Sequence, residues 1–71
     1  MNEVTSSMAG TVLDITVNTG EQVTSAQEVL KLESMKMEIP IESGINGTVR
    51  EIKVNIGDFV NEGDVLVLIE D

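Results

Sequence analysis

Lys36 is the residue of this chain best suited to chemistry. It lies in the run Glu33–Glu38, where Met35 precedes it and Met37 follows it, so a primary amine stands between two apolar thioether side chains. Such flanks are unusual on a solvated surface. They suit a lysine that another protein must recognise and modify, because methionine is soft and adapts to different binding surfaces. The run therefore indicates an acceptor lysine.

Residues that usually carry catalysis or bind metals are missing. The chain has no histidine and no cysteine, so it lacks a proton shuttle for neutral pH, a thiol nucleophile and a zinc-binding cluster. The acidic residues do not have the spacing of a calcium loop, and the glycines fit no phosphate-binding loop. Glu33 and Glu38 could form an acid–base pair, but nothing in the sequence suggests the burial that would tune them. We therefore expect no catalytic residue and no metal site.

Charge and composition exclude several partners. Thirteen acidic residues against four basic ones give a formal net charge of −9, which argues against nucleic acid and anionic membranes and favours a basic partner surface. No apolar run approaches the roughly 20 residues of a membrane span, and the N-terminus does not resemble a signal peptide. The absence of cysteine fits a reducing compartment. We expect one small domain over residues 1–71, monomeric in isolation and cytoplasmic.

The lysine lies between two copies of an internal repeat. The pattern Gly-Thr-Val-x-x-Ile-x-Val-Asn-x-Gly-x-x-Val covers residues 10–23 and returns 37 positions later over residues 47–60. Each copy leads into a further apolar run. Two copies are too few for a solenoid, so we expect two similar halves that pack face to face about a pseudo-two-fold axis. Lys36 would then lie at one end of the molecule and both termini at the other.

Alternating apolar residues predict strands throughout. Ile15 and Val17 alternate with polar neighbours, and Ile52 and Val54 do the same in the second copy. The predicted core, taken from these rows and from the longer apolar runs, consists of Ile15, Val17, Ile52, Val54, Val29–Leu32 and Val65–Ile69. Val12 and Val49 fall out of phase with the rows, which predicts a bend or bulge at the same place in each half.

The segment around Lys36 reads as the tip of a β-hairpin. Ser34–Met37 lies between two alternating runs and would present Lys36 at or beside the apex. Because this tip contains neither Gly nor Asn-Gly, we expect a type I turn rather than a primed one. Pro40 cannot donate a hydrogen bond, so its nitrogen should face away from a partner strand.

From Met8 to Glu70 the chain resembles the biotinyl and lipoyl attachment domains. The signature of the attachment site is carried by Glu33, Met35, Lys36 and Met37. This resemblance implies an all-β fold, a flattened barrel or sandwich of two four-stranded antiparallel sheets with pseudo-two-fold symmetry. It also implies that the modified lysine lies on an exposed hairpin, remote from both termini.

The sequence departs from the family pattern in two places. Ala26 stands where the family usually has Gly, as Gly63 does in the second half, so either Ala26 is strained or its turn has changed type. The stretch Gly20–Gln27 is too short for the protruding thumb that some bacterial biotin carriers fold over the cofactor.

The resemblance implies a biotin carboxyl carrier. A biotin protein ligase would attach biotin covalently to Lys36, and the residues recognised by the ligase or by other enzymes would be Glu33, Met35, Met37 and Glu38. The attached biotin would carry a carboxyl group from a biotin carboxylase site to a carboxyltransferase site. The carrier would supply a high effective concentration of cofactor at both sites and no bond chemistry of its own.

Two alternatives remain open. A lipoyl carrier shares the fold and the hairpin lysine, but its lysine is usually flanked by Asp and Ala, so Met35 and Met37 favour biotin over lipoate. A ligase of loose specificity could still load either cofactor. The other alternative, from a different class, is an unmodified β-domain that only mediates protein interaction. A free-standing attachment protein and a domain excised from a carboxylase would look the same.

Overall fold

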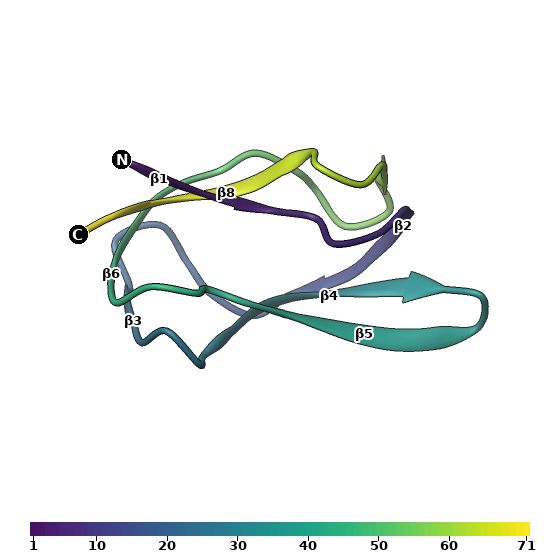
Figure 1. Ribbon diagram of the computed structural model, residues 1–71, viewed down its shortest axis with the longest axis horizontal. Coiled ribbons are helices and arrows are strands. Elements are labelled where there is room, and N and C mark those ends of the chain that lie inside the picture. Colours follow the sequence, from purple (N-terminus) through teal and green to yellow (C-terminus); the bar gives the residue numbers. More distant parts are fainter.

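Strands make up all the regular structure of the protein. The computed structural model describes residues 1–71 and contains eight strands, β1 (Asn2–Thr5), β2 (Gly10–Ile15), β3 (Gln22–Val23), β4 (Glu28–Ser34), β5 (Met37–Glu42), β6 (Gly47–Ile52), β7 (Phe59–Val60) and β8 (Val65–Glu70). They form two four-stranded antiparallel sheets, ordered β1-β8-β6-β3 and β5-β4-β2-β7 (Figure 1). The predicted all-β fold of two such sheets is confirmed. No helix is present that could span a membrane.

The internal repeat appears as a pseudo-two-fold symmetry of the backbone. If each strand of β1–β4 is exchanged with its counterpart in β5–β8, the strand order of one sheet becomes that of the other. Backbone hydrogen bonds also occur at equivalent positions in the two halves. Val12 N–H donates to Asp58 O, and Val49 N–H donates to Glu21 O, both at 2.9 Å. Each sheet takes two strands from each half. The halves are therefore interlocked, rather than being two separate layers packed face to face as the sequence suggested.

A bulge in each half decides which residues enter the core. The strand register shifts between Val12 and Asp14 and again between Val49 and Glu51, which confirms the predicted irregularities. Because of these bulges, Val12 and Val49 are fully buried, while Ile52 is only partly buried. The buried apolar core consists of Val4, Val12, Val17, Val23, Val29, Leu30, Leu32, Ile41, Val49, Val60, Leu66, Val67 and Ile69. The expectation that Ile15, Ile52 and Val54 belong to the buried core was wrong, since they pack against it from its margin. Val65 and Leu68, also expected in the core, are only partly buried.

Four of the turns outside the β4–β5 hairpin are stabilised by the same kind of side-chain hydrogen bond. In each turn the backbone N–H of the first residue donates to the side chain of the residue three positions later, in the pairs Asn18–Glu21, Thr24–Gln27, Asn55–Asp58 and Asn61–Asp64. Gly20, Gly57 and Gly63 have a positive φ, as expected for turn glycines. Ala26 does not, so its turn has changed type and Ala26 avoids strain.

The hairpin β4–β5 and the chain termini lie at opposite ends of an elongated molecule (Figure 1). The principal extents are 32 × 17 × 17 Å, and the hairpin tip and the termini mark the two ends of the long axis in Figure 1. Pro40 lies on β5, at the edge of its sheet, where no second strand needs the missing N–H. The fold thus holds the Lys36 turn as far as it can from both termini.

Candidate attachment lysine

The turn that carries Lys36 is a two-residue loop. Ser34 of β4 pairs with Met37 of β5, which leaves only Met35 and Lys36 between the strands. Their φ values are 53° and 65°, and positive φ at both central residues defines a type I′ turn. The predicted type I turn was therefore wrong. The right-handed twist of the paired strands favours the primed turn in a two-residue loop, even though neither residue is of a type that prefers this conformation.

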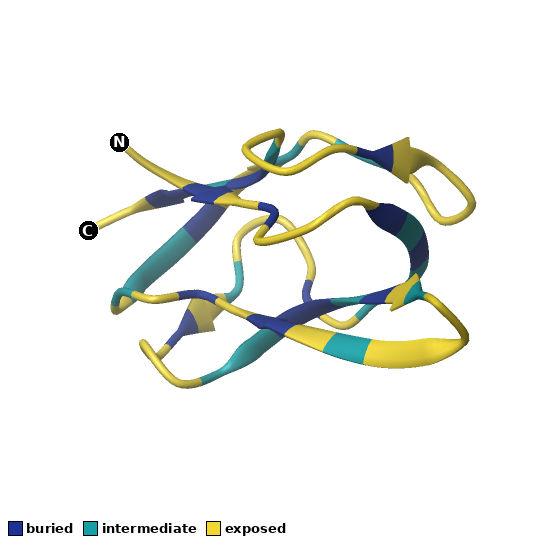
Figure 2. Cartoon of the chain, turned by 45° about the vertical axis from the view of Figure 1, so that its right-hand side comes forward, coloured by how far each residue is buried: buried dark blue, intermediate teal, exposed yellow.

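Lys36 is free of any partner within the protein. The other three basic side chains each form an ion pair: Lys31 with Glu38, Arg50 with Glu70, and Lys53 with Glu51. Lys36 forms none and is exposed at the tip, and Figure 2 shows that exposure extends along this end of the hairpin. Its amine can therefore be reached by another molecule, which is the geometry that covalent attachment of a cofactor requires.

The methionines beside Lys36 are solvent-exposed. Met35 is 92% exposed and Met37 is 63% exposed, so neither contributes to the buried core. Large apolar side chains in this position do not stabilise the fold and are available for contact with an enzyme surface. Both side chains are therefore open to contact with another molecule, and their part in recognition of Lys36 stays a prediction.

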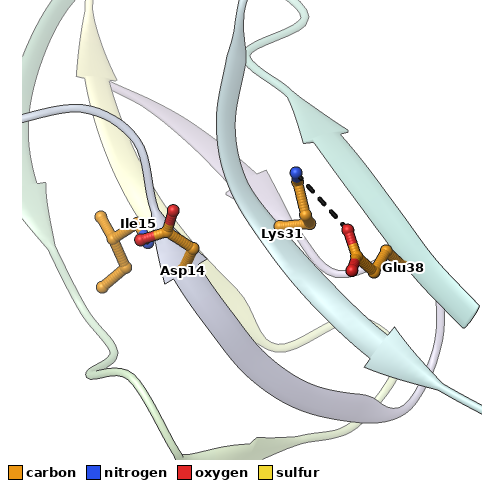
Figure 3. A network of polar contacts seen from close by, with 4 residues as sticks. All are labelled: Asp14, Ile15, Lys31 and Glu38. Carbon is orange, nitrogen blue, oxygen red and sulfur yellow. Dashed lines mark hydrogen bonds and ion pairs between the residues drawn. The ribbon is translucent and has the colours of Figure 1, made fainter. Parts of the chain in front are cut away.

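Glu33 and Glu38 lie directly opposite each other on β4 and β5. Both are exposed, so the structure offers no burial that could tune an acid–base pair. Repulsion between facing carboxylates is relieved by Lys31, whose Nζ lies 3.6 Å from Glu38 Oε1 (Figure 3). Together these groups make one side of the hairpin acidic just below Lys36.

The molecule has no enclosed pocket beside Lys36. Its one open depression lies between β3, the start of β6 and the end of β8, at the end that carries the termini. No group of three or more acidic side chains is placed to bind a metal ion. The functional feature at the hairpin is thus the projecting amine of Lys36 itself, with no cavity of the chain beside it.

Comparison with known proteins identifies the class. The family model described as biotin-requiring enzyme, which covers biotin and lipoyl attachment domains, matches residues 2–69. The biotin/lipoyl attachment protein of Bacillus subtilis is 55% identical over 84% of this chain and 82% of its own length. The biotin carboxyl carrier protein of Streptococcus mutans is 44% identical over 96% of this chain and 52% of its own length. The crystal structure of Kluyveromyces lactis urea carboxylase superposes with a TM-score of 0.92 at 26% identity, over 97% of this chain and 6% of that one.

The chain belongs to the biotin/lipoyl attachment family. Membership confirms the resemblance drawn from the sequence, and with it the role of a carrier domain and biotin as the cofactor. One surface feature was not predicted from the sequence, namely the exposed residues Ile56 and Phe59. A signal was available, because these residues stand where the first copy of the repeat has Thr19 and Gln22.

Proposed function

We propose that the protein is a biotin carboxyl carrier in which biotin is joined through an amide bond to Nζ of Lys36. One observation carries the proposal: Lys36 is the only basic side chain without an acidic partner, and it occupies the apex of an exposed two-residue turn. A biotin protein ligase presents the biotin carboxyl group as an adenylate. The lysine amine attacks this group, the amide forms and AMP leaves.

The chain itself binds no substrate and catalyses no step. When attached, biotin takes up a carboxyl group at one enzyme site and releases it at another. The contribution of this chain is positional: the interlocked sheets present the hairpin at one end of the molecule, and the lysine side chain carries the cofactor into each site. The partners we propose are a biotin protein ligase and the biotin carboxylase and carboxyltransferase components of a carboxylase. We further propose a cytoplasmic, monomeric protein.

Lipoate is the second candidate cofactor, because the most similar of the relatives described above is named a biotin/lipoyl attachment protein. Met35 and Met37 distinguish the two candidates. Both are exposed on the turn, and both differ from the Asp and Ala that usually flank a lipoylated lysine.

Ligation of wild type and Lys36→Arg tests the proposal. Each protein is incubated with biotin, ATP and a purified biotin ligase, followed by intact mass measurement and peptide mapping. We expect a single biotin on wild type, located on Lys36, and none on the variant, because Arg keeps the charge but offers no acylable amine. Label on Lys31 or Lys53, or on the variant, would contradict the assignment. A parallel reaction with a lipoate ligase and lipoate decides whether both cofactors are accepted.

A further inference from the structure

Two large apolar side chains outside the hairpin, Ile56 and Phe59, are mostly exposed to solvent and lie outside the buried core. Ile56 is 62% exposed and Phe59 is 66% exposed, and Phe59 is the only aromatic residue of the chain. We refer to these two residues as the β7 patch. Burying one aromatic side chain of this kind in a partner can remove most of its apolar surface from water, so such residues often dominate binding.

The strand register places Phe59 of the β7 patch on the same surface as Glu33 and Glu38. Phe59 pairs with Thr11, Thr11 pairs with Glu33, and Glu33 pairs with Glu38, so the four residues form one row across the sheet β5-β4-β2-β7. Side chains of directly paired residues point to the same face of a sheet. Glu33, Glu38 and Phe59 are all exposed, so this row lies on the outer face of the sheet. From strand spacing and rise, Phe59 lies on the order of 15 Å from Lys36 along the surface.

The turn before β7 is fixed to the neighbouring strand. Gly57 N–H donates to Val12 O at 2.8 Å, and Val12 N–H donates to Asp58 O at 2.9 Å. These bonds hold the segment that presents Ile56 and Phe59 against β2. A partner would therefore meet a preformed surface and would not have to order a loop.

The equivalent segment in the other half of the molecule shows whether the fold itself requires apolar residues at these two positions. Around Thr19 and Gln22 the backbone makes the same bonds, with Gly20 N–H donating to Val49 O at 2.7 Å and Val49 N–H donating to Glu21 O at 2.9 Å. The fold therefore accepts polar residues at both positions. Each copy runs from one end of the molecule to the other, and apolar residues occupy these two positions only in the second copy, whose segment 56–59 lies beside the hairpin. This placement points to a requirement of binding and not of folding.

We propose that the β7 patch is a docking site for the ligase that modifies Lys36; this inference rests on the proposed function. Among the possible partners we choose the ligase because of the distance that the lysine side chain can extend from the turn. Before modification, only the lysine's own methylene chain projects the amine beyond the turn, so the ligase must lie close against the hairpin end. After modification the arm is longer, and later enzymes can remain further away. The complementary surface is an apolar recess for Phe59 and Ile56, flanked by Lys or Arg side chains that face Glu33 and Glu38.

Exchange of residues between the two repeat copies tests the docking site. The variant Ile56→Thr with Phe59→Gln replaces the patch by the residues of the first copy. A second variant adds Thr19→Ile with Gln22→Phe, which restores the wild-type composition but places the apolar pair at the terminal end. For a purified biotin ligase we expect both variants to show a higher KM for the carrier, with kcat/KM roughly tenfold lower and kcat little changed. Addition of Thr19→Ile with Gln22→Phe to wild type should leave these constants unchanged.

Each outcome decides the proposal. A kcat/KM within twofold of wild type in the first variant would overturn the docking site while leaving Lys36 as the acceptor. Wild type that takes no label would refute the proposed function and the docking site together. Loss of carboxyl transfer with normal ligation would assign the patch to a carboxylase, and a dimer of wild type that the first variant abolishes would assign it to a second copy; both results overturn the proposal.

Because the variants could fail to fold, a nuclear magnetic resonance measurement on the wild-type protein tests the docking site independently. Addition of ligase to isotope-labelled wild-type carrier should shift the amide resonances of residues 56–60 as well as those of the hairpin. Shifts confined to the hairpin would contradict the docking site. Thermal unfolding of each variant, followed by circular dichroism, checks that the exchanged residues leave the fold intact.

Discussion

At the residue scale, the turn at Met35 and Lys36 is not built for stability. Both residues adopt a left-handed backbone conformation that favours glycine or asparagine, at a cost of roughly 1–3 kcal/mol each. Nothing within the fold requires a methionine at position 35, since its side chain is almost entirely exposed. The strain is consistent with a turn whose residue types are set by recognition of the lysine.

Relief of this strain gives a testable effect. Met35→Asn should raise the free energy of unfolding by about 1 kcal/mol, because asparagine tolerates the left-handed region. The same change should slow biotin ligation, because it removes an apolar flank of Lys36. Met37→Asn is the matched control: it alters the other flank but lies in the extended strand β5, where asparagine is disfavoured. Urea unfolding that finds Met35→Asn no more stable than Met37→Asn would count against the strained turn.

At the element scale, the bulges in β2 and β6 redirect side chains. An extended strand alternates its faces, so a residue out of phase would ordinarily point to solvent. The register shift after Val49 turns it inward, and the residues that follow it on the other phase reach only the margin of the core. The equivalent shift after Val12 has the same result in the other half.

Two valine truncations test this placement. Val49→Ala removes atoms from a site that is 0% exposed and should lower the free energy of unfolding by about 2 kcal/mol. Val54→Ala removes the same atoms from a partly buried site and should cost less than half as much. Denaturant unfolding of both variants measures the difference. Equal losses would mean that the bulge does not decide which valine is buried.

At the scale of the whole molecule, the cofactor site and the core are separate. The core lies between the sheets, while the Lys36 turn projects at one end of a molecule whose longest extent is 32 Å. Each sheet takes strands from both halves, so neither half can unfold without breaking both sheets. Binding and modification at the hairpin end should therefore leave the fold unchanged.

Stability should accordingly be independent of the cofactor. Unmodified and biotinylated protein are expected to unfold cooperatively, with free energies of unfolding within about 1 kcal/mol of each other, because an exposed arm buries little apolar area. Thermal and urea unfolding of the two forms, separated by avidin affinity, provide the comparison. An unmodified protein without cooperative unfolding would show that the attached group is part of the fold.

The all-β class, the two-copy architecture and the exposed position of Lys36 could be predicted from the sequence, because they depend on local signals; the role of Lys36 as acceptor stays a prediction. Met35 and Met37 mark Lys36, alternation marks the strands, and the repeat marks the symmetry. The positions of both bulges could also be predicted, since Val12 and Val49 break the alternation in each copy.

Only the tertiary structure decided the turn type, the membership of the core and the surface beside the lysine. The type I′ turn depends on the twist and register of β4 and β5, which a search for glycine in the turn cannot detect. Burial of Val49 in preference to Ile52 depends on the direction in which the bulge turns the chain. The row from Glu38 to Phe59 joins residues 21 positions apart through three strand pairings, so these residues come close together only once the whole sheet β5-β4-β2-β7 has formed.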